Sequence, residues 1–121
     1  MKAHHRKRLL RLADLLDTVP PEHFDLGVWL AGDGPPCKTA ACAVGWATTI
    51  PAFRRAGLTT DSSGWPIYSE WGGFNAAEQF FGLTEDDALH LFASSYRYRL
   101  ADLTRPTTVA RRIREFVEAQ P

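Results

Sequence analysis

Apolar side chains recur with the spacing of an α-helix near both ends of this chain, and this pattern constrains the fold more than any other sequence feature. The first stripe comprises Leu9, Leu12, Ala13 and Leu16, and the second comprises Val109, Ala110, Ile113, Phe116 and Val117. Positions i, i+3, i+4 and i+7 share one helix face, so each stripe can be buried while charged residues face solvent. Prolines bound both segments, at residues 20–21 and 106. We therefore expect two amphipathic helices in a mainly α domain.

Shorter helices are predicted between these two. The small, apolar run Thr39–Ile50 (TAACAVGWATTI) predicts a buried central helix that Thr39 caps and the following proline ends. Asn75 opens a sequence that resembles a capping box, which predicts a helix ending near Phe81. Thr84 is expected to cap the next helix. The sequence thus predicts a compact single domain of about five helices over residues 1–121, with a flexible N-terminus at residues 1–5.

Residues 58–73 (LTTDSSGWPIYSEWGG) break the helical pattern. Residues 58–60 and 66–68 can pair as a small β-hairpin across residues 61–64; otherwise this stretch is an irregular aromatic loop. Three aromatic residues lie here among glycines: Trp65, Tyr68 and Trp71. Loops of this composition often supply binding hot spots, although they also cover the cores of small domains. These three residues are the first candidate binding site.

The segment Tyr96-Arg97-Tyr98-Arg99 is the second candidate. In an extended backbone, Tyr96 and Tyr98 share one face while Arg97 and Arg99 share the other. Arginine forks suit phosphate, and tyrosine rings can stack on bases. The alternative is a surface segment whose tyrosines pack inward.

The two cysteines, Cys37 and Cys42, give the spacing C-x4-C. A zinc site needs four ligands, and none of the four histidines lies at a ligand spacing from these cysteines. No metal or cofactor is therefore expected. A nucleophilic Cys37 at a helix N-terminus would have a lowered pKa, but no histidine or acid is placed by sequence to complete a dyad. A structural role for both cysteines is preferred, and no catalytic residue is predicted.

The formal net charge is zero, yet the charges are segregated along the chain. Basic residues crowd both ends, whereas the chain between Gly57 and Tyr96 contains acidic residues and no Lys or Arg. These charges can pair within one molecule, between subunits of a homo-oligomer, or with separate partners. The helix-turn-helix outline of residues 76–92 carries Glu85, Asp86 and Asp87 where a recognition helix would begin. Carboxylates there repel phosphates, and zero net charge supplies no general positive field, so double-stranded DNA is not expected as a partner.

Neither a membrane span nor an export signal is expected. No apolar run approaches the roughly 20 residues that a span needs. The basic start is followed by amphipathic rather than continuously apolar sequence. With 2 cysteines in the chain, a reducing cytoplasm is the expected compartment.

Four stretches are familiar in combination: Leu9–Phe24 (LLRLADLLDTVPPEHF), Cys37–Phe53 (CKTAACAVGWATTIPAF), Ala76–Leu83 (AAEQFFGL) and Pro106–Val117 (PTTVARRIREFV). The second contains a C-x4-C-x2-G-W core. Together the four stretches resemble an uncharacterised family of small hypothetical proteins from bacteriophages and bacteria. In that family glycine is associated with the position after the first cysteine, where this chain has Lys38. The resemblance implies a phage or mobile-element origin and a location in the cytoplasm of a bacterial host, and it assigns no catalytic residue.

Three functions follow in order of preference. Because small phage proteins without catalytic motifs commonly bind a host component, we expect a non-catalytic binding protein of the inhibitor or counter-defence type. It would engage a host macromolecule through the three aromatic residues of the first candidate site. The alternative is a protein that sequesters a small anionic ligand such as a cyclic nucleotide. The arginines that would hold its phosphate are Arg97 and Arg99, with Arg111 or Arg114. A cysteine-dependent enzyme that uses Cys37 ranks third.

Overall fold

The computed structural model describes residues 1–26, 42–62, 64–93 and 98–120, and in these ranges the chain is mainly helical. The elements in chain order are α1 (Ala3–Leu16), the 3₁₀ turn η1 (Pro21–His23), α2 (Ala43–Ala47), α3 (Pro51–Arg55), β1 (Leu58–Thr60), β2 (Pro66–Tyr68), β3 (Trp71–Gly72), α4 (Phe74–Phe81), α5 (Glu85–Phe92), the 3₁₀ turn η2 (Leu100–Thr104) and α6 (Pro106–Glu118). The predicted fold class, mainly α with a small hairpin, is confirmed.

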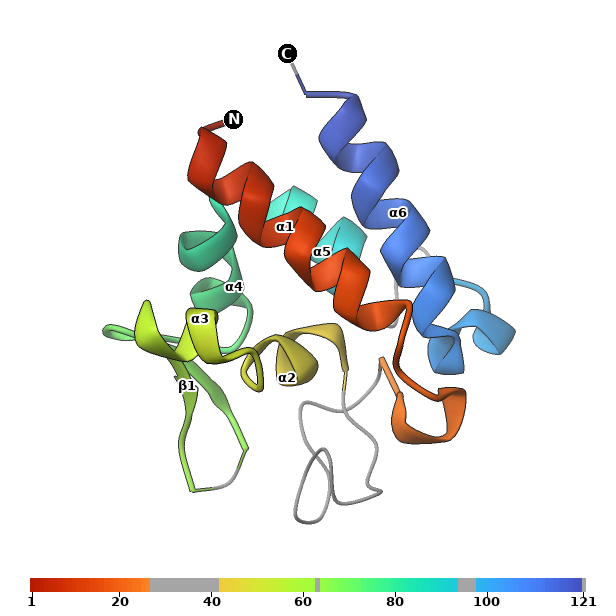
Figure 1. Cartoon of the computed structure of the whole chain (residues 1–121), viewed down its shortest axis with the longest axis horizontal. Coiled ribbons are helices and arrows are strands. Elements are labelled where there is room, and N and C mark those ends of the chain that lie inside the picture. Colours follow the sequence, from red (N-terminus) through yellow and green to blue (C-terminus); the bar gives the residue numbers. More distant parts are fainter. Residues whose placement is uncertain (27–41, 63, 94–97, 121) are drawn as a thin grey trace.

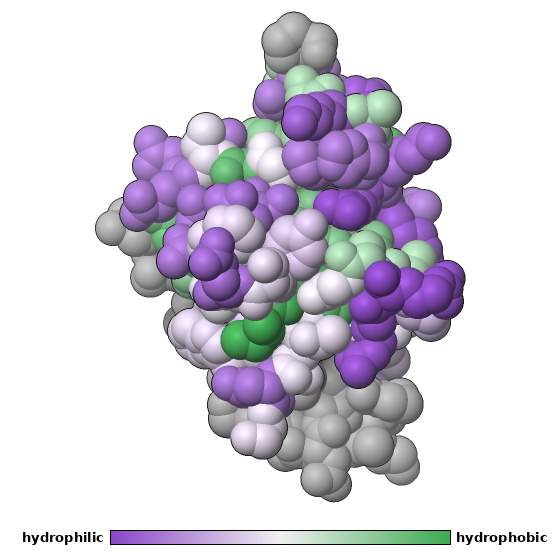
Figure 2. Space-filling view, turned by 90° about the vertical axis from the view of Figure 1, so that its left-hand side faces the viewer, coloured by the Kyte–Doolittle hydropathy of each residue, from purple (hydrophilic) through white to green (hydrophobic). Residues whose placement is uncertain are grey.

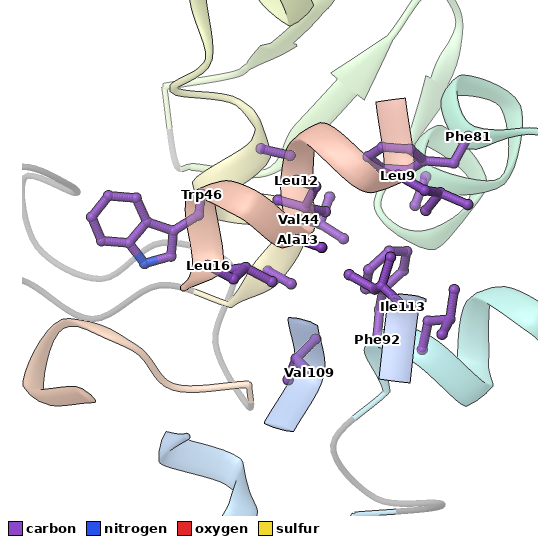
Figure 3. Packing of buried hydrophobic residues seen from close by; sticks show 14 of the residues in the cluster. Leu9, Leu12, Ala13, Leu16, Val44, Trp46, Phe81, Phe92, Val109 and Ile113 are labelled. Atoms are coloured by element: carbon purple, nitrogen blue, oxygen red, sulfur yellow. The ribbon is translucent and has the colours of Figure 1, made fainter. Parts of the chain in front are cut away.

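Helices α1 and α6 lie side by side in opposite directions, so that both ends of the chain lie at the same end of the molecule (Figure 1). The two predicted stripes form their contact. Leu9, Leu12, Ala13 and Leu16 are all fully buried, as are Val109, Ala110 and Ile113. Figure 3 shows side chains of α1 meeting Val44 of α2, Phe81 of α4 and Ile113 of α6. The core therefore lies where the helices from both halves of the chain converge.

The three strands form one antiparallel sheet in the order β1-β2-β3. Leu58 pairs with Tyr68 and Thr60 with Pro66, which is the predicted hairpin. A third strand, which the sequence analysis did not predict, adds the pair Ile67 and Gly72. Helix α4 packs on this sheet, where the Phe80 ring meets the Tyr68 ring edge to face at a centroid distance of 5.2 Å.

The central helix begins later than the sequence analysis predicts. Cys42 has extended backbone angles, φ −77° and ψ 176°, and its Sγ accepts a hydrogen bond from the Gly45 N–H at 3.4 Å. Cys42 is therefore the N-cap, and the expected cap Thr39 lies outside the described residues. The helix also ends early, because the Thr48 hydroxyl donates to the Gly45 carbonyl at 2.6 Å. Side-chain bonds of this kind offer the backbone an alternative to continued helix.

The start of α4 also differs from the prediction. Asn75 lies inside the helix, and the N-cap is Gly73, with φ 61° and ψ −132°. The Gly73 N–H donates a hydrogen bond to the Pro66 carbonyl of β2 at 2.9 Å, so Gly73 still pairs with the sheet. Sheet pairing thus decides where α4 begins. The predicted ends nearby are confirmed: Gly82 closes α4 in the left-handed conformation, and Thr84 Oγ1 accepts from the Asp87 N–H at 3.1 Å.

Helix α1 begins at Ala3, inside the stretch for which a flexible terminus is predicted. Its N-cap residue Lys2 makes no side-chain capping bond. Residues 3–5 are thus helical, while their mobility in solution stays a prediction.

Candidate functional site

The hairpin turn holds Trp65 by its backbone. The Trp65 N–H donates to the Asp61 Oδ1 at 2.9 Å, and the Asp61 N–H donates to the Trp65 carbonyl at 3.0 Å. Although its backbone is fixed, the Trp65 side chain is 42% exposed, more than any other large hydrophobic side chain in the described part of the chain. An exposed indole on a fixed backbone is the first element of a binding surface.

Two glycines, Gly72 at the end of β3 and Gly73 directly after it, let the indole lie against the sheet. A Cβ at Gly73 would lie 2.6 Å from the Trp65 Cζ2, and a Cβ at Gly72 would overlap the Trp65 Nε1. No residue larger than glycine fits under the ring at either position without displacing it. The Nε1–Cζ2 side of the indole therefore packs against glycine backbone. This packing limits the conformational entropy that the side chain can lose on binding.

The other two aromatic candidates are less exposed. Tyr68 is half-buried and points toward Phe80, because alternate residues of a strand face opposite sides of the sheet. Ile67 is half-buried and lies on the side opposite to Tyr68, and the same alternation places the exposed Trp65 on the side of Ile67. Trp71, the Cα partner of Tyr68, is also half-buried. Directly paired residues of an antiparallel sheet share a side, so Trp71 lies on the side of Tyr68. We call Trp65 and Ile67, on the other side, the sheet surface.

Figure 2 shows the side of the molecule on which the sheet and α4 lie. Near-neutral residues cover much of its lower half, around a small strongly hydrophobic patch, with hydrophilic residues beside and above. An apolar centre with a polar rim is common in protein-binding surfaces, and the small hydrophobic patch here has near-neutral and hydrophilic residues around it.

The second candidate segment is described only in part. Tyr96 and Arg97 lie outside the described residues, and Arg99 is exposed. The Tyr98 hydroxyl donates to the Leu91 carbonyl at 2.8 Å, and the Arg112 guanidinium lies 3.8 Å from the centroid of its ring. Burial raises the pKa of Tyr98 well above its usual value. These contacts agree with the inward-packing alternative for Tyr98.

Arginines perform a structural role that the sequence analysis missed. The last carbonyls of a helix lack intrahelical partners and carry its partial negative charge, so a cation stabilises them. Four arginines donate to such carbonyls: Arg8 to Phe80 at 2.7 Å, Arg112 to His90 at 3.1 Å, Arg54 to Thr48 at 3.1 Å and Arg6 to Val117 at 3.4 Å. Most of these pairs join residues far apart along the chain, so no local spacing could have indicated them.

The remaining arginines of α6 form ion pairs. Arg114 lies 2.9 Å from the Asp14 carboxylate and 2.7 Å from the Asp17 carboxylate, which joins α6 to the end of α1. Arg111 lies 3.6 Å from Glu115 on its own helix. The α6 arginines that could have held an anionic ligand thus already face carboxylates. Of the basic residues near the C-terminus, Arg114 thus pairs with acidic residues at the end of α1.

Cys42 has the environment of a core residue. It is buried, and burial raises the pKa of its thiol to about 11. A thiol of this pKa is almost entirely protonated at neutral pH and is a poor nucleophile. Cys37, the candidate of the third hypothesis, lies outside the described residues.

We expect Cys42 to resist alkylation in the native protein. In a Cys37→Ser variant, iodoacetamide at about pH 8 should label Cys42 at least 100-fold more slowly than in urea, because the thiol must first be exposed and ionised. Intact-mass spectrometry over time measures this rate, with the urea-unfolded variant as the control. Labelling of the folded variant at the unfolded rate would show that the thiol is accessible.

Within residues 1–26, 42–62, 64–93 and 98–120, no three His, Cys, Asp or Glu side chains are grouped closely enough to hold a metal ion. No helix in these ranges combines the length and the apolar character required to cross a membrane. Neither a protein-family model, nor a curated protein, nor a solved structure matches this chain.

Proposed function

We propose that this chain is a non-catalytic binding protein that engages a host protein through the sheet surface, with Trp65 as its anchor. The observation that carries the proposal is an exposed tryptophan, 42% accessible, whose indole packs against two glycines and whose backbone N–H and carbonyl both hydrogen-bond to Asp61. The phage or mobile-element origin, and a counter-defence or inhibitory role, rest on the family resemblance of the sequence.

A preorganised tryptophan suits this role for two reasons. Tryptophan is enriched among the few residues that dominate binding energy at interfaces, because it buries a large apolar area and has few rotatable bonds. The neighbouring residue Ile67, on the same side of the sheet, is half-buried, so it can add apolar contact beside the anchor without large rearrangement. Trp65 and Ile67 together supply apolar area for the centre of such an interface.

The contacts around Tyr98 and Arg114 give less support to the sequestration of an anionic ligand. The Tyr98 ring already lies against the Arg112 guanidinium, and its hydroxyl donates a hydrogen bond to the Leu91 carbonyl. Arg114 already faces two carboxylates. A ligand that used these groups would have to replace interactions that hold α5, α6 and α1 together. The sheet surface requires no such replacement.

Alanine substitution of Trp65 tests the proposal. Wild-type protein and Trp65→Ala, each biotinylated at the C-terminus, are used to capture proteins from host-cell lysate, and captured proteins are quantified by mass spectrometry. The purified partner is then titrated against both. We expect Trp65→Ala to weaken binding by roughly 30-fold or more, which corresponds to the loss of about 2 kcal/mol expected for a hot-spot residue.

Glu22→Ala is the matched control, because Glu22 is exposed in η1, away from the sheet (Figure 1). This variant should bind the partner as the wild type does, and circular dichroism should show that both variants are folded. A partner that binds wild type and Trp65→Ala equally, or the absence of any protein specific to the wild type, would contradict the proposal.

A further inference from the structure

Helix α1 divides its basic residues between two roles. Arg6 and Arg8 lie on the flanks, where they donate to carbonyls at the ends of α6 and α4. His4, Lys7 and Arg11 follow one another at helical spacing on the side opposite the buried stripe, and all three are exposed. With Lys2 at the N-cap, they form a row of basic residues, which we call the α1 ridge.

The α1 ridge has no acidic counterpart within the described chain. The first acidic residue of α1 is Asp14, which already pairs with Arg114 at 2.9 Å. The ion pairs recorded among the described residues include none with Lys2, Lys7 or Arg11. The acidic residues of the middle of the chain therefore do not neutralise this ridge by direct contact.

Helix stability does not explain these cations. The N-terminus of a helix carries partial positive charge, so cations in the first turn oppose folding, and like charges one turn apart oppose it further. α1 has neither an acidic residue in its first turn nor a side-chain cap, whereas α5 has Thr84 as its cap and three acidic residues. A placement that local energetics disfavour is a common mark of a functional surface.

The environment of His5 agrees with a positive local potential. Burial against Gly82 lowers the pKa of His5, and the charges that lower it further are those of His4, Arg8, Lys2 and the chain's amino group. All these charged neighbours are basic. An anion that approaches this end of α1 is therefore attracted even though the whole chain is neutral.

We infer that the α1 ridge binds the phosphate backbone of single-stranded nucleic acid, weakly and without reading its sequence. Exposed, flexible cations in a row suit a chain of phosphates better than a single small anion, which needs converging donors. α1 packs against α6 on one flank and α4 on the other, which leaves the face with the ridge open to a chain of phosphates (Figure 1). A flexible strand can follow the ridge. This inference is independent of the sheet surface.

Fluorescence anisotropy of a labelled oligothymidine of about 20 nucleotides tests the inference at salt concentrations of roughly 50 to 200 mM. If the three cations Lys2, Lys7 and Arg11 each displace one counterion, the logarithm of the observed association constant should fall with the logarithm of the salt concentration with a slope of about −2. Lys7→Glu/Arg11→Glu should weaken binding at least tenfold at the lowest salt. The milder Lys7→Gln/Arg11→Gln, which preserves helix propensity, should weaken it at least threefold.

Arg55→Glu/Arg111→Glu is the control for net charge, because it alters the total charge equally at two exposed arginines outside the ridge. This variant and Trp65→Ala should bind the oligonucleotide within about threefold of wild type, which separates the ridge from the sheet surface. The inference is overturned by absent binding at low salt, by equal losses in both glutamate variants, or by tighter binding of the matching duplex.

Discussion

Replacing Phe80 with alanine is expected to lower the free energy of unfolding by about 3–5 kcal/mol. Phe80 is fully buried, and its ring meets those of Phe53 and Phe81 at centroid distances of 4.9 and 5.1 Å. The Arg8 guanidinium lies 4.0 Å from the same ring. The substitution therefore opens a cavity where α1, α3, α4 and the sheet meet, and it removes a cation–π contact. Urea denaturation followed by circular dichroism measures the loss.

Phe80→Leu is the control for this prediction. Leucine fills most of the volume and keeps the site apolar, so its cost should stay near about 1–1.5 kcal/mol. A domain of this size has a total stability of roughly 6–18 kcal/mol, so the alanine variant should lose a large fraction of it. A loss below about 1 kcal/mol for Phe80→Ala would show that the four elements do not pack around this ring.

Gly73→Ala should cost about 2–4 kcal/mol, because two penalties add at this residue. The backbone angles, φ 61° and ψ −132°, are strained for any residue with a Cβ. The new methyl group would also lie 2.6 Å from the Trp65 Cζ2, so the indole must move. Chemical denaturation measures the stability, and a change in the native tryptophan emission reports the displaced ring.

Two comparisons separate the penalties at Gly73. Gly57 also has a positive φ, 107°, but a Cβ there would lie 3.4 Å from the Tyr68 ring, which is an acceptable contact after slight adjustment. Gly57→Ala should therefore cost less, about 1–2 kcal/mol. In a Trp65→Ala background, Gly73→Ala should cost less than in the wild type, because the clash is gone. Equal costs in both backgrounds would show that the indole does not rest on this glycine.

The end helices and the hairpin could be predicted from sequence because their signals are local. The stripe of α1 and that of α6 each define one face of one helix, and the pairing of residues 58–60 with 66–68 follows from a short turn between two β-prone runs. The same locality explains the error at the start of α4. Asn75 resembles a cap, but pairing with β2 places Gly73 there, and sheet pairing is set by contacts that no capping motif encodes.

The site was predictable in part. Composition indicated Trp65, Tyr68 and Trp71 together, but strand alternation turns Tyr68 toward the core and leaves Trp65 the most exposed of them. The sequence offered no sign that Gly72 and Gly73 would support the indole, because that contact depends on the third strand. The arginine–carbonyl bonds were equally hidden, since donor and acceptor belong to different helices.

Because α1 and α6 are antiparallel, both ends of the chain leave the molecule at one end, and the sheet lies toward the other (Figure 1). A tether at either end therefore presents the sheet surface away from the support. The same tether holds the basic start of α1 close to that support, where a single-stranded nucleic acid has little room to bind. Immobilised protein should thus capture partners of the sheet surface efficiently, whereas oligonucleotide binding is best measured with both molecules in solution.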